Sequence, residues 1–71
     1  MITPHMTLQS TRDAHIWASE FGLSSSDEID NVARWIWENK PYIGCAFAEF
    51  ESANADILES EEFWDIANGG R

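Results

Sequence analysis

Apolar side chains recur at helical spacing along most of the chain, which predicts a protein built from short helices. The first set at this spacing is Ala14, Trp17, Ala18 and Phe21. Ser10 precedes this set and is a good N-cap residue. Gly22 follows it and supplies the left-handed residue that commonly ends helices. These signals together predict a first helix over residues 11–21.

A second helix is indicated by a capping box, in which Ser25 is followed three residues later by Glu28. The apolar residues that come next form an i, i+3, i+4, i+7 stripe of Ile29, Val32, Ala33 and Ile36. We therefore expect a helix near residues 26–39. Trp35 and Trp37 flank the stripe on opposite sides, so at least one of them should be partly exposed.

The stretch 42–51 is compatible with two structures. A strand would place Ile43, Cys45 and Phe47 on one face, but only residues 1–9 are free to pair with it. Because an isolated two-stranded ribbon is marginally stable, a helix is favoured here. Residues 1–9 are expected to form an arm, flexible unless its apolar side chains pack on the body.

The pattern of residues 53–68 predicts a segment of one helix or two short ones, with Asn54 or Ser60 as caps, that ends at Gly69-Gly70. Its apolar positions are Ile57, Leu58, Phe63, Trp64 and Ala67. The expected fold is therefore a small all-α bundle of three to four short helices.

We expect one domain over residues 1–71, with an arm at 1–9 and a short tail at 69–71. The alternative is an α+β fold with a small ribbon from residues 1–9 and 42–51. His5-Met6 is a pair that a common cloning site encodes, so a vector origin of residues 1–5 is a further alternative. The four tryptophans are first explained as core residues, because each supplies a large buried area to a small protein.

Charge changes this picture, because the chain holds 13 acidic and 4 basic residues, for a net charge of −9. Residues 42–71 contain seven of the acids and one base, Arg71, and so carry −6 of that total. Like charge gathered on one surface steers oppositely charged partners. The other interpretation of this charge is solubility.

Several chemistries are disfavoured by the motifs. The acidic run at 27–31 lacks the spacing and central glycine of a calcium loop. Cys45 has no Cys or His partner at zinc-site spacing, and as the only cysteine it cannot form an internal disulfide. No glycine-rich phosphate loop is present, and nucleic-acid binding needs clustered Lys and Arg. We therefore expect neither an enzyme, a cofactor nor a metal site.

The remaining hypothesis is interaction with a basic protein. Asp56, Glu59, Glu62 and Asp65 recur every three residues, and on one helix they would form a slowly drifting stripe. Helical neighbours lie ~5–6 Å apart, comparable with the spacing of phosphates along a nucleic-acid strand. The predicted binding residues are Glu49, Glu51, Asp56, Glu59, Glu61, Glu62, Asp65 and Trp37, the last as an exposed anchor. The alternative is an ordinary solvated helix face, with Ile57, Trp64 and Ala67 turned inward.

In small size, acidity and aromatic content the chain resembles the accessory proteins with which phages and plasmids inhibit host defences, such as anti-CRISPR and anti-restriction inhibitors. The resemblance implies a non-enzymatic inhibitor, acting in the bacterial cytoplasm, that occupies the basic nucleic-acid site of a nuclease or surveillance complex. The alternative is a helical adaptor or antitoxin-like module that binds through an apolar face. Neither nucleic acid nor membrane is an expected partner, and a homodimer is compatible with the small core.

Overall fold

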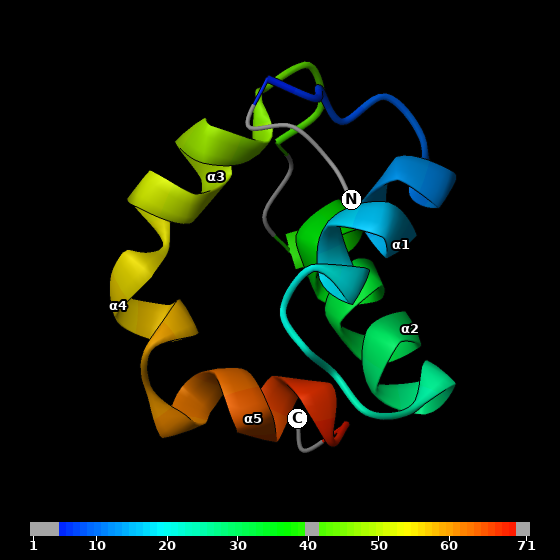
Figure 1. Cartoon of the computed structure of the whole chain (residues 1–71), viewed down its shortest axis with the longest axis vertical. Helices are drawn as coiled ribbons and strands as arrows, with labels where there is room; N and C mark the ends of the chain where they lie inside the picture. The colour runs from blue at the N-terminus through cyan, green and yellow to red at the C-terminus, as the bar shows by residue number, and fades with distance from the viewer. Residues whose placement is uncertain (1–4, 40–41, 70–71) are drawn as a thin grey trace.

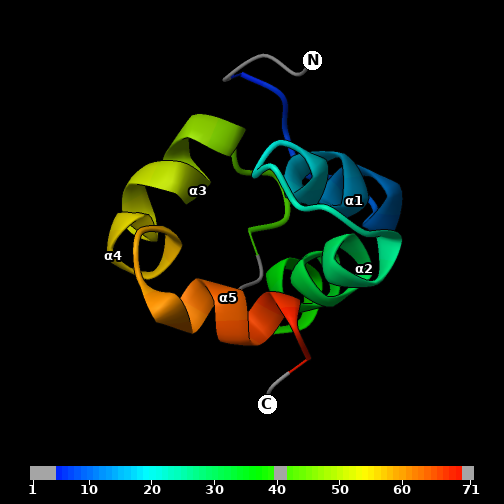
Figure 2. The same cartoon turned by 60° about the horizontal axis from the view of Figure 1, so that its bottom comes forward.

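The computed structural model describes residues 5–39 and 42–69 and is all-α, as the hydrophobic pattern predicts. Its elements are α1 (Thr11–Ser19), α2 (Ser26–Arg34), the π-helix η1 (Trp35–Asn39), α3 (Phe47–Ala53), α4 (Ala55–Leu58) and α5 (Glu61–Ala67). α1 and α2 lie side by side, α3 and α4 lie on the opposite side, and α5 joins the two sides (Figures 1 and 2). None of the described helices is long and apolar enough to cross a membrane.

The helices surround a core rich in aromatic rings, with Phe50 at its centre. Phe50 is fully buried and lies within 5.3 Å, centroid to centroid, of both Trp17 and Tyr42. Trp35 contacts Phe50 edge to face at 5.9 Å. Such pairs contribute about 0.5–1.5 kcal/mol each beyond the area they bury. Trp17 and Trp35 are therefore core residues, as expected for the tryptophans of so short a chain.

The predicted start of α1 is confirmed, since the Ser10 hydroxyl accepts a hydrogen bond from the Asp13 N–H. Asp13 in turn accepts from the N–H of Gln9, at 3.0 Å, rather than from Ser10. The helix ends at Ser19, two residues earlier than expected, and Gly22 follows with φ at +74°.

Of the two hydrogen bonds of the capping box predicted for α2, the one to the Ser25 hydroxyl is confirmed, whereas the Glu28 carboxylate accepts from Ser24 instead of Ser25. The Ser25 hydroxyl accepts from the Glu28 N–H at 3.2 Å, and the Glu28 carboxylate accepts from both the N–H and the hydroxyl of Ser24 at 2.9 Å. These hydrogen bonds favour the charged carboxylate, the backbone bond most strongly, and hold the pKa of Glu28 below its ordinary value. The predicted helix 26–39 is present, but from Trp35 onward it has π rather than α geometry.

The expectation of a helix throughout 42–51 is wrong for its first five residues. The N–H of Leu8 donates to the carbonyl of Cys45 at 3.1 Å, and the N–H of Phe47 donates to the carbonyl of Met6 at 2.8 Å. Isolated β-bridges therefore join residues 7–8 to residues 43 and 46, and α3 begins only at Phe47.

The arm packs against the body through these bonds, with Leu8 fully buried and Met6 packed on the core. The alternative ribbon was thus correct about the partner of residues 42–46, although no strand forms among the described residues. The expectations for residues 1–4 of the arm and for the tail beyond Gly69 fall outside the described residues.

The C-terminal segment forms two short helices, one of the two outcomes expected. Ser60 caps α5 by accepting from the Glu62 N–H, while its hydroxyl donates to the carbonyl of Ile57. Asn54 does not cap α4. It is buried instead, and its Nδ2 donates to the Tyr42 hydroxyl at 3.0 Å and to the Phe50 carbonyl at 3.1 Å.

Candidate functional site

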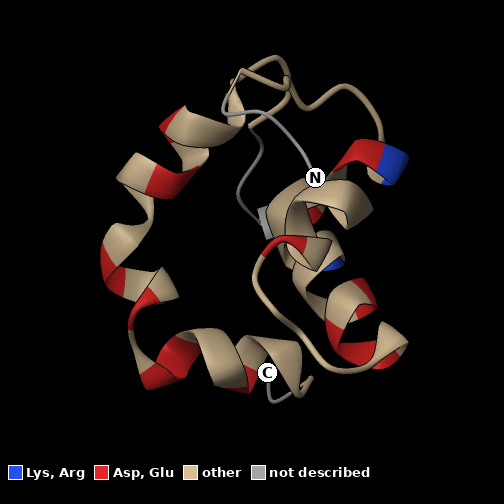
Figure 3. Ribbon diagram, in the orientation of Figure 1, with Lys and Arg blue, Asp and Glu red and all other residues tan. Residues whose placement is uncertain are grey.

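The seven carboxylates predicted to bind a partner all belong to the segment that contains α3, α4 and α5. We call them the acidic arc: Glu49, Glu51, Asp56, Glu59, Glu61, Glu62 and Asp65. Every one of these residues is exposed. Figure 3 shows acidic positions recurring along these three helices, whereas the two arginines of the described residues lie on α1 and α2. Residues 42–69 contain no Lys or Arg, so all the charged residues of this segment are acidic.

The acids of the arc do not form the single-helix stripe that their spacing predicted. A stripe needs a continuous helix from Asp56 to Asp65, but α4 ends at Leu58 and α5 begins at Glu61. The cap made by Ser60 breaks the helix between them. The carboxylates are consequently distributed over three short helices and the connection between α4 and α5, which follow the edge of the molecule (Figure 3).

Trp37 is not placed with these acids. It is half-buried in η1 and lines a hollow with residues of α1 and α2, and no acid of the arc lines that hollow. The exposed aromatic residue of the acidic segment is Trp64 in α5, which keeps 47% of its surface accessible. Its ring meets Phe63 edge to face at 5.5 Å.

The expectation that Trp64 turns inward is therefore wrong. Phe63 and Ala67 are both buried and lie one helical turn apart, so they define the inward face of α5. Trp64 follows Phe63 and is rotated by about 100° from that face. A helical wheel restricted to residues 61–67 could have found this exposure, but the predicted range 53–68 obscured it.

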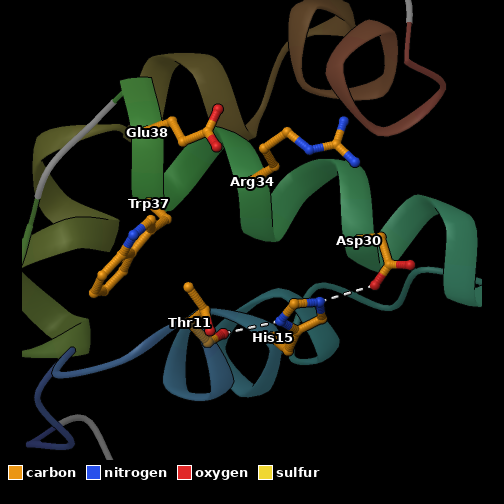
Figure 4. A pocket seen from close by; sticks show the side chains of 6 residues that line it. All are labelled: Thr11, His15, Asp30, Arg34, Trp37 and Glu38. Atoms are coloured by element: carbon orange, nitrogen blue, oxygen red, sulfur yellow. Dashed lines mark hydrogen bonds and ion pairs between the residues drawn. The ribbon is translucent and has the colours of Figure 1, made fainter.

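The hollow that contains Trp37 lies between α1 and the α2–η1 segment (Figure 4). It has a volume of about 340 Å³ and is lined by Thr11, His15, Asp30, Arg34, Trp37 and Glu38. Figure 4 shows Trp37 and His15 projecting into the space between the two helices. No sequence motif indicated this hollow, because its residues come together only when α1 packs against α2.

His15 is held at both ring nitrogens. Nδ1 lies 2.9 Å from the carbonyl oxygen of Thr11, and Nε2 lies 2.8 Å from a carboxylate oxygen of Asp30. Both partners are hydrogen-bond acceptors, so a ring nitrogen that carries a proton donates to the oxygen beside it. This arrangement fixes the ring as one wall of the hollow and connects α1 to α2.

The side chains that could support metal or thiol chemistry are scattered. Within residues 5–39 and 42–69, no group of three or more His, Cys, Asp or Glu is arranged to hold a metal ion. Cys45 is half-buried.

Comparison with known proteins gives no relative from which a function could be inferred, so the function is inferred from the structure. No protein-family model, no curated protein and no solved structure matches this chain.

Proposed function

We propose that the protein is a non-enzymatic inhibitor that presents its acidic arc to the basic nucleic-acid-binding site of another protein. One observation carries this proposal: seven exposed carboxylates occupy α3, α4 and α5 and their connections, in a segment without a single Lys or Arg. Because these charges share one sign and one region, their potentials add and attract a positively charged surface.

The mechanism is competition for the lysines and arginines that would otherwise contact phosphates. The carboxylates pair with these side chains, and the protein body excludes the nucleic acid sterically. Trp64 lies among the acids of α5 and supplies the apolar anchor, the role that the sequence had assigned to Trp37. An exposed tryptophan suits this role, since tryptophan is enriched among the residues that dominate binding energy at protein interfaces.

The proposed partner is a nuclease or a surveillance complex that acts on nucleic acid in the bacterial cytoplasm. This part of the proposal rests on the resemblance to phage and plasmid anti-defence proteins in size, acidity and aromatic content. An anti-CRISPR or anti-restriction role is the specific form that we propose. The protein would bind the basic partner and not nucleic acid itself.

The alternative is a helical adaptor or antitoxin-like module that binds through an apolar surface. The observation in its favour is the exposure of two large apolar residues, Ile43 at 58% and Trp64 at 47%. They belong to different segments, the bridge region and α5, and the second shares its helix with Glu61, Glu62 and Asp65. We therefore favour the electrostatic mechanism.

A salt-controlled pull-down separates the two functions. The tagged protein is compared in a bacterial lysate with an E59K/E62K variant and with an E20K/D27K control, which adds the same charge at exposed positions outside the arc. We expect the wild type and the control to capture a nucleic-acid enzyme at low salt and to release it at high salt, because exposed charge pairs are screened.

The E59K/E62K variant should capture none of that enzyme. A partner retained at high salt and bound equally by both variants would support the adaptor. Folding of each variant is checked by circular dichroism, so that lost binding is not confused with lost structure.

A further inference from the structure

We propose that the hollow between α1 and η1 binds a flat aromatic ligand with a single carboxylate. The hollow shares no residue with the acidic arc, so this inference does not depend on the proposed function. Its volume of about 340 Å³ lies at the lower end of the range for small-molecule sites.

Two aromatic side chains line the hollow and would contact the ring of the ligand. The Trp37 indole is half-buried and projects from η1 toward α1 (Figure 4). The His15 imidazole projects from α1 and cannot rotate freely, because Thr11 and Asp30 hold both of its nitrogens. A planar group can stack on such rings without requiring either of them to reorganise.

The carboxylate would pair with Arg34, whose guanidinium extends away from Trp37 and His15 in Figure 4 and would turn toward the bound ligand. This arginine is exposed and forms no ion pair with any described residue, although all thirteen acids of the chain are described. Asp30, one turn before it on α2, is already bonded to His15. A guanidinium presents two parallel N–H groups that match a carboxylate, and this fork distinguishes Arg from Lys.

The surrounding charges limit the ligand to one negative charge. Glu38 and Asp30 line the same hollow, and the whole chain carries −9. One carboxylate can be compensated by Arg34, but a second negative charge would be repelled by these acids. We therefore assign a monocarboxylate rather than a phosphate to this site.

The π-helix provides an independent reason to expect a ligand here. Trp37 and Glu38 both lie in η1, where the backbone has left α geometry for one widened turn. Turns of this kind are uncommon and occur frequently at functional sites.

The test is a titration of the isotope-labelled protein followed by two-dimensional NMR, with benzoate as the probe. Benzamide has the same shape without the charge, and phenyl phosphate has the same ring with more charge. We expect saturable shifts for Thr11, His15 and the Trp37 indole N–H with benzoate, at a dissociation constant of about 1 mM. Benzamide and phenyl phosphate should bind at least ~10-fold more weakly.

Two arginine variants show whether the site is responsible. R34Q should abolish the benzoate shifts, whereas R12Q removes the other described arginine, which does not line the hollow, and should leave them unchanged. R34K retains the charge without the fork and should bind several-fold more weakly than wild type. Shifts that do not saturate, equal affinity for benzamide, stronger binding of phenyl phosphate, or wild-type affinity in R34Q would each overturn the proposal.

Discussion

The side chain of Asn31 on α2 donates an amide N–H to the backbone carbonyl of Ala67 at the end of α5, across 2.8 Å. The last carbonyls of a helix have no partner within the helix. Asn31 supplies that partner to α5 from a residue 36 positions earlier in the chain. The bond therefore ties the helix pair α1 and α2 to the end of the acidic segment.

Replacing Asn31 by alanine should lower the free energy of unfolding by about 1 kcal/mol, the usual net value of a hydrogen bond that is partly shielded from water. Urea denaturation followed by tryptophan fluorescence measures this change. Asn68→Ala is the matched control, since Asn68 is exposed and its side chain makes no hydrogen bond among the described residues. Equal stability of the two variants would contradict the assigned role of Asn31.

Phe50→Ala should be far more damaging. Phe50 contacts the rings of five neighbours, which are Trp17, Phe21, Trp35, Tyr42 and Phe47. Truncating a buried phenylalanine costs about 3–5 kcal/mol, comparable with the whole stability of a 71-residue protein. The variant should therefore lose its near-ultraviolet circular dichroism at 25 °C. Phe50→Leu keeps most of the volume and should remain folded.

The starts of α1, α2 and α5 were predictable from sequence because their causes are local. Ser10, Ser25 and Ser60 each cap a helix through bonds to residues two or three positions away, so the pattern of side chains contains the information. The path of residues 42–46 was not predictable in this way. It depends on backbone bonds to Met6 and Leu8, and a short segment does not reveal such distant pairing.

The candidate site was also predictable only where its features have local causes. The charge and exposure of the acidic arc follow from composition, because acidic side chains remain in water unless paired. The half-buried position of Trp37 and the exposure of Trp64 do not follow from composition. Trp37 is half-buried because α1 packs against the helix that carries it, and this packing partner is invisible in the local pattern.

The capping bonds of Glu28 predict a dependence of stability on pH. Its pKa is lowered in the folded state, chiefly by the hydrogen bond from the backbone N–H of Ser24. Between the folded and the ordinary pKa, the unfolded chain binds more protons than the folded one, so stability rises with pH. The contribution is complete above the ordinary pKa and is lost as the pH falls through the folded value.

Glu28→Gln removes this titration while retaining an acceptor. Chemical denaturation of both proteins across the acid range should show the stability advantage of wild type shrinking as the pH falls. Glu20→Gln, at an exposed carboxylate without a described hydrogen bond, provides the control. An advantage that is independent of pH would contradict the role assigned to the Glu28 carboxylate.

Gly44 should resist substitution for a backbone reason alone. Its φ is +86°, and a Cβ built there would meet no atom within 4 Å. Gly44→Ala should therefore destabilise the protein by about 1–2 kcal/mol through left-handed strain without steric overlap. Thermal unfolding measures the change in stability. Ala48→Gly, at an exposed position in α3, is the reference variant, because it shows the effect of the reverse exchange between Ala and Gly where the backbone is helical.

Trp64→Ala should separate binding from stability if the acidic arc is the contact surface. The side chain is 47% exposed, so its removal should change the free energy of unfolding much less than Trp17→Ala, where the ring is fully buried. Binding to the partner captured in the pull-down should weaken by at least about 2 kcal/mol, as for a central interface residue, or roughly 30-fold in Kd. Trp37→Ala, outside the arc, should leave that affinity unchanged. Calorimetric titration of the wild type, Trp64→Ala and Trp37→Ala with the partner measures these affinities. A larger loss of affinity in Trp37→Ala than in Trp64→Ala would place the contact surface on the α1–η1 side instead.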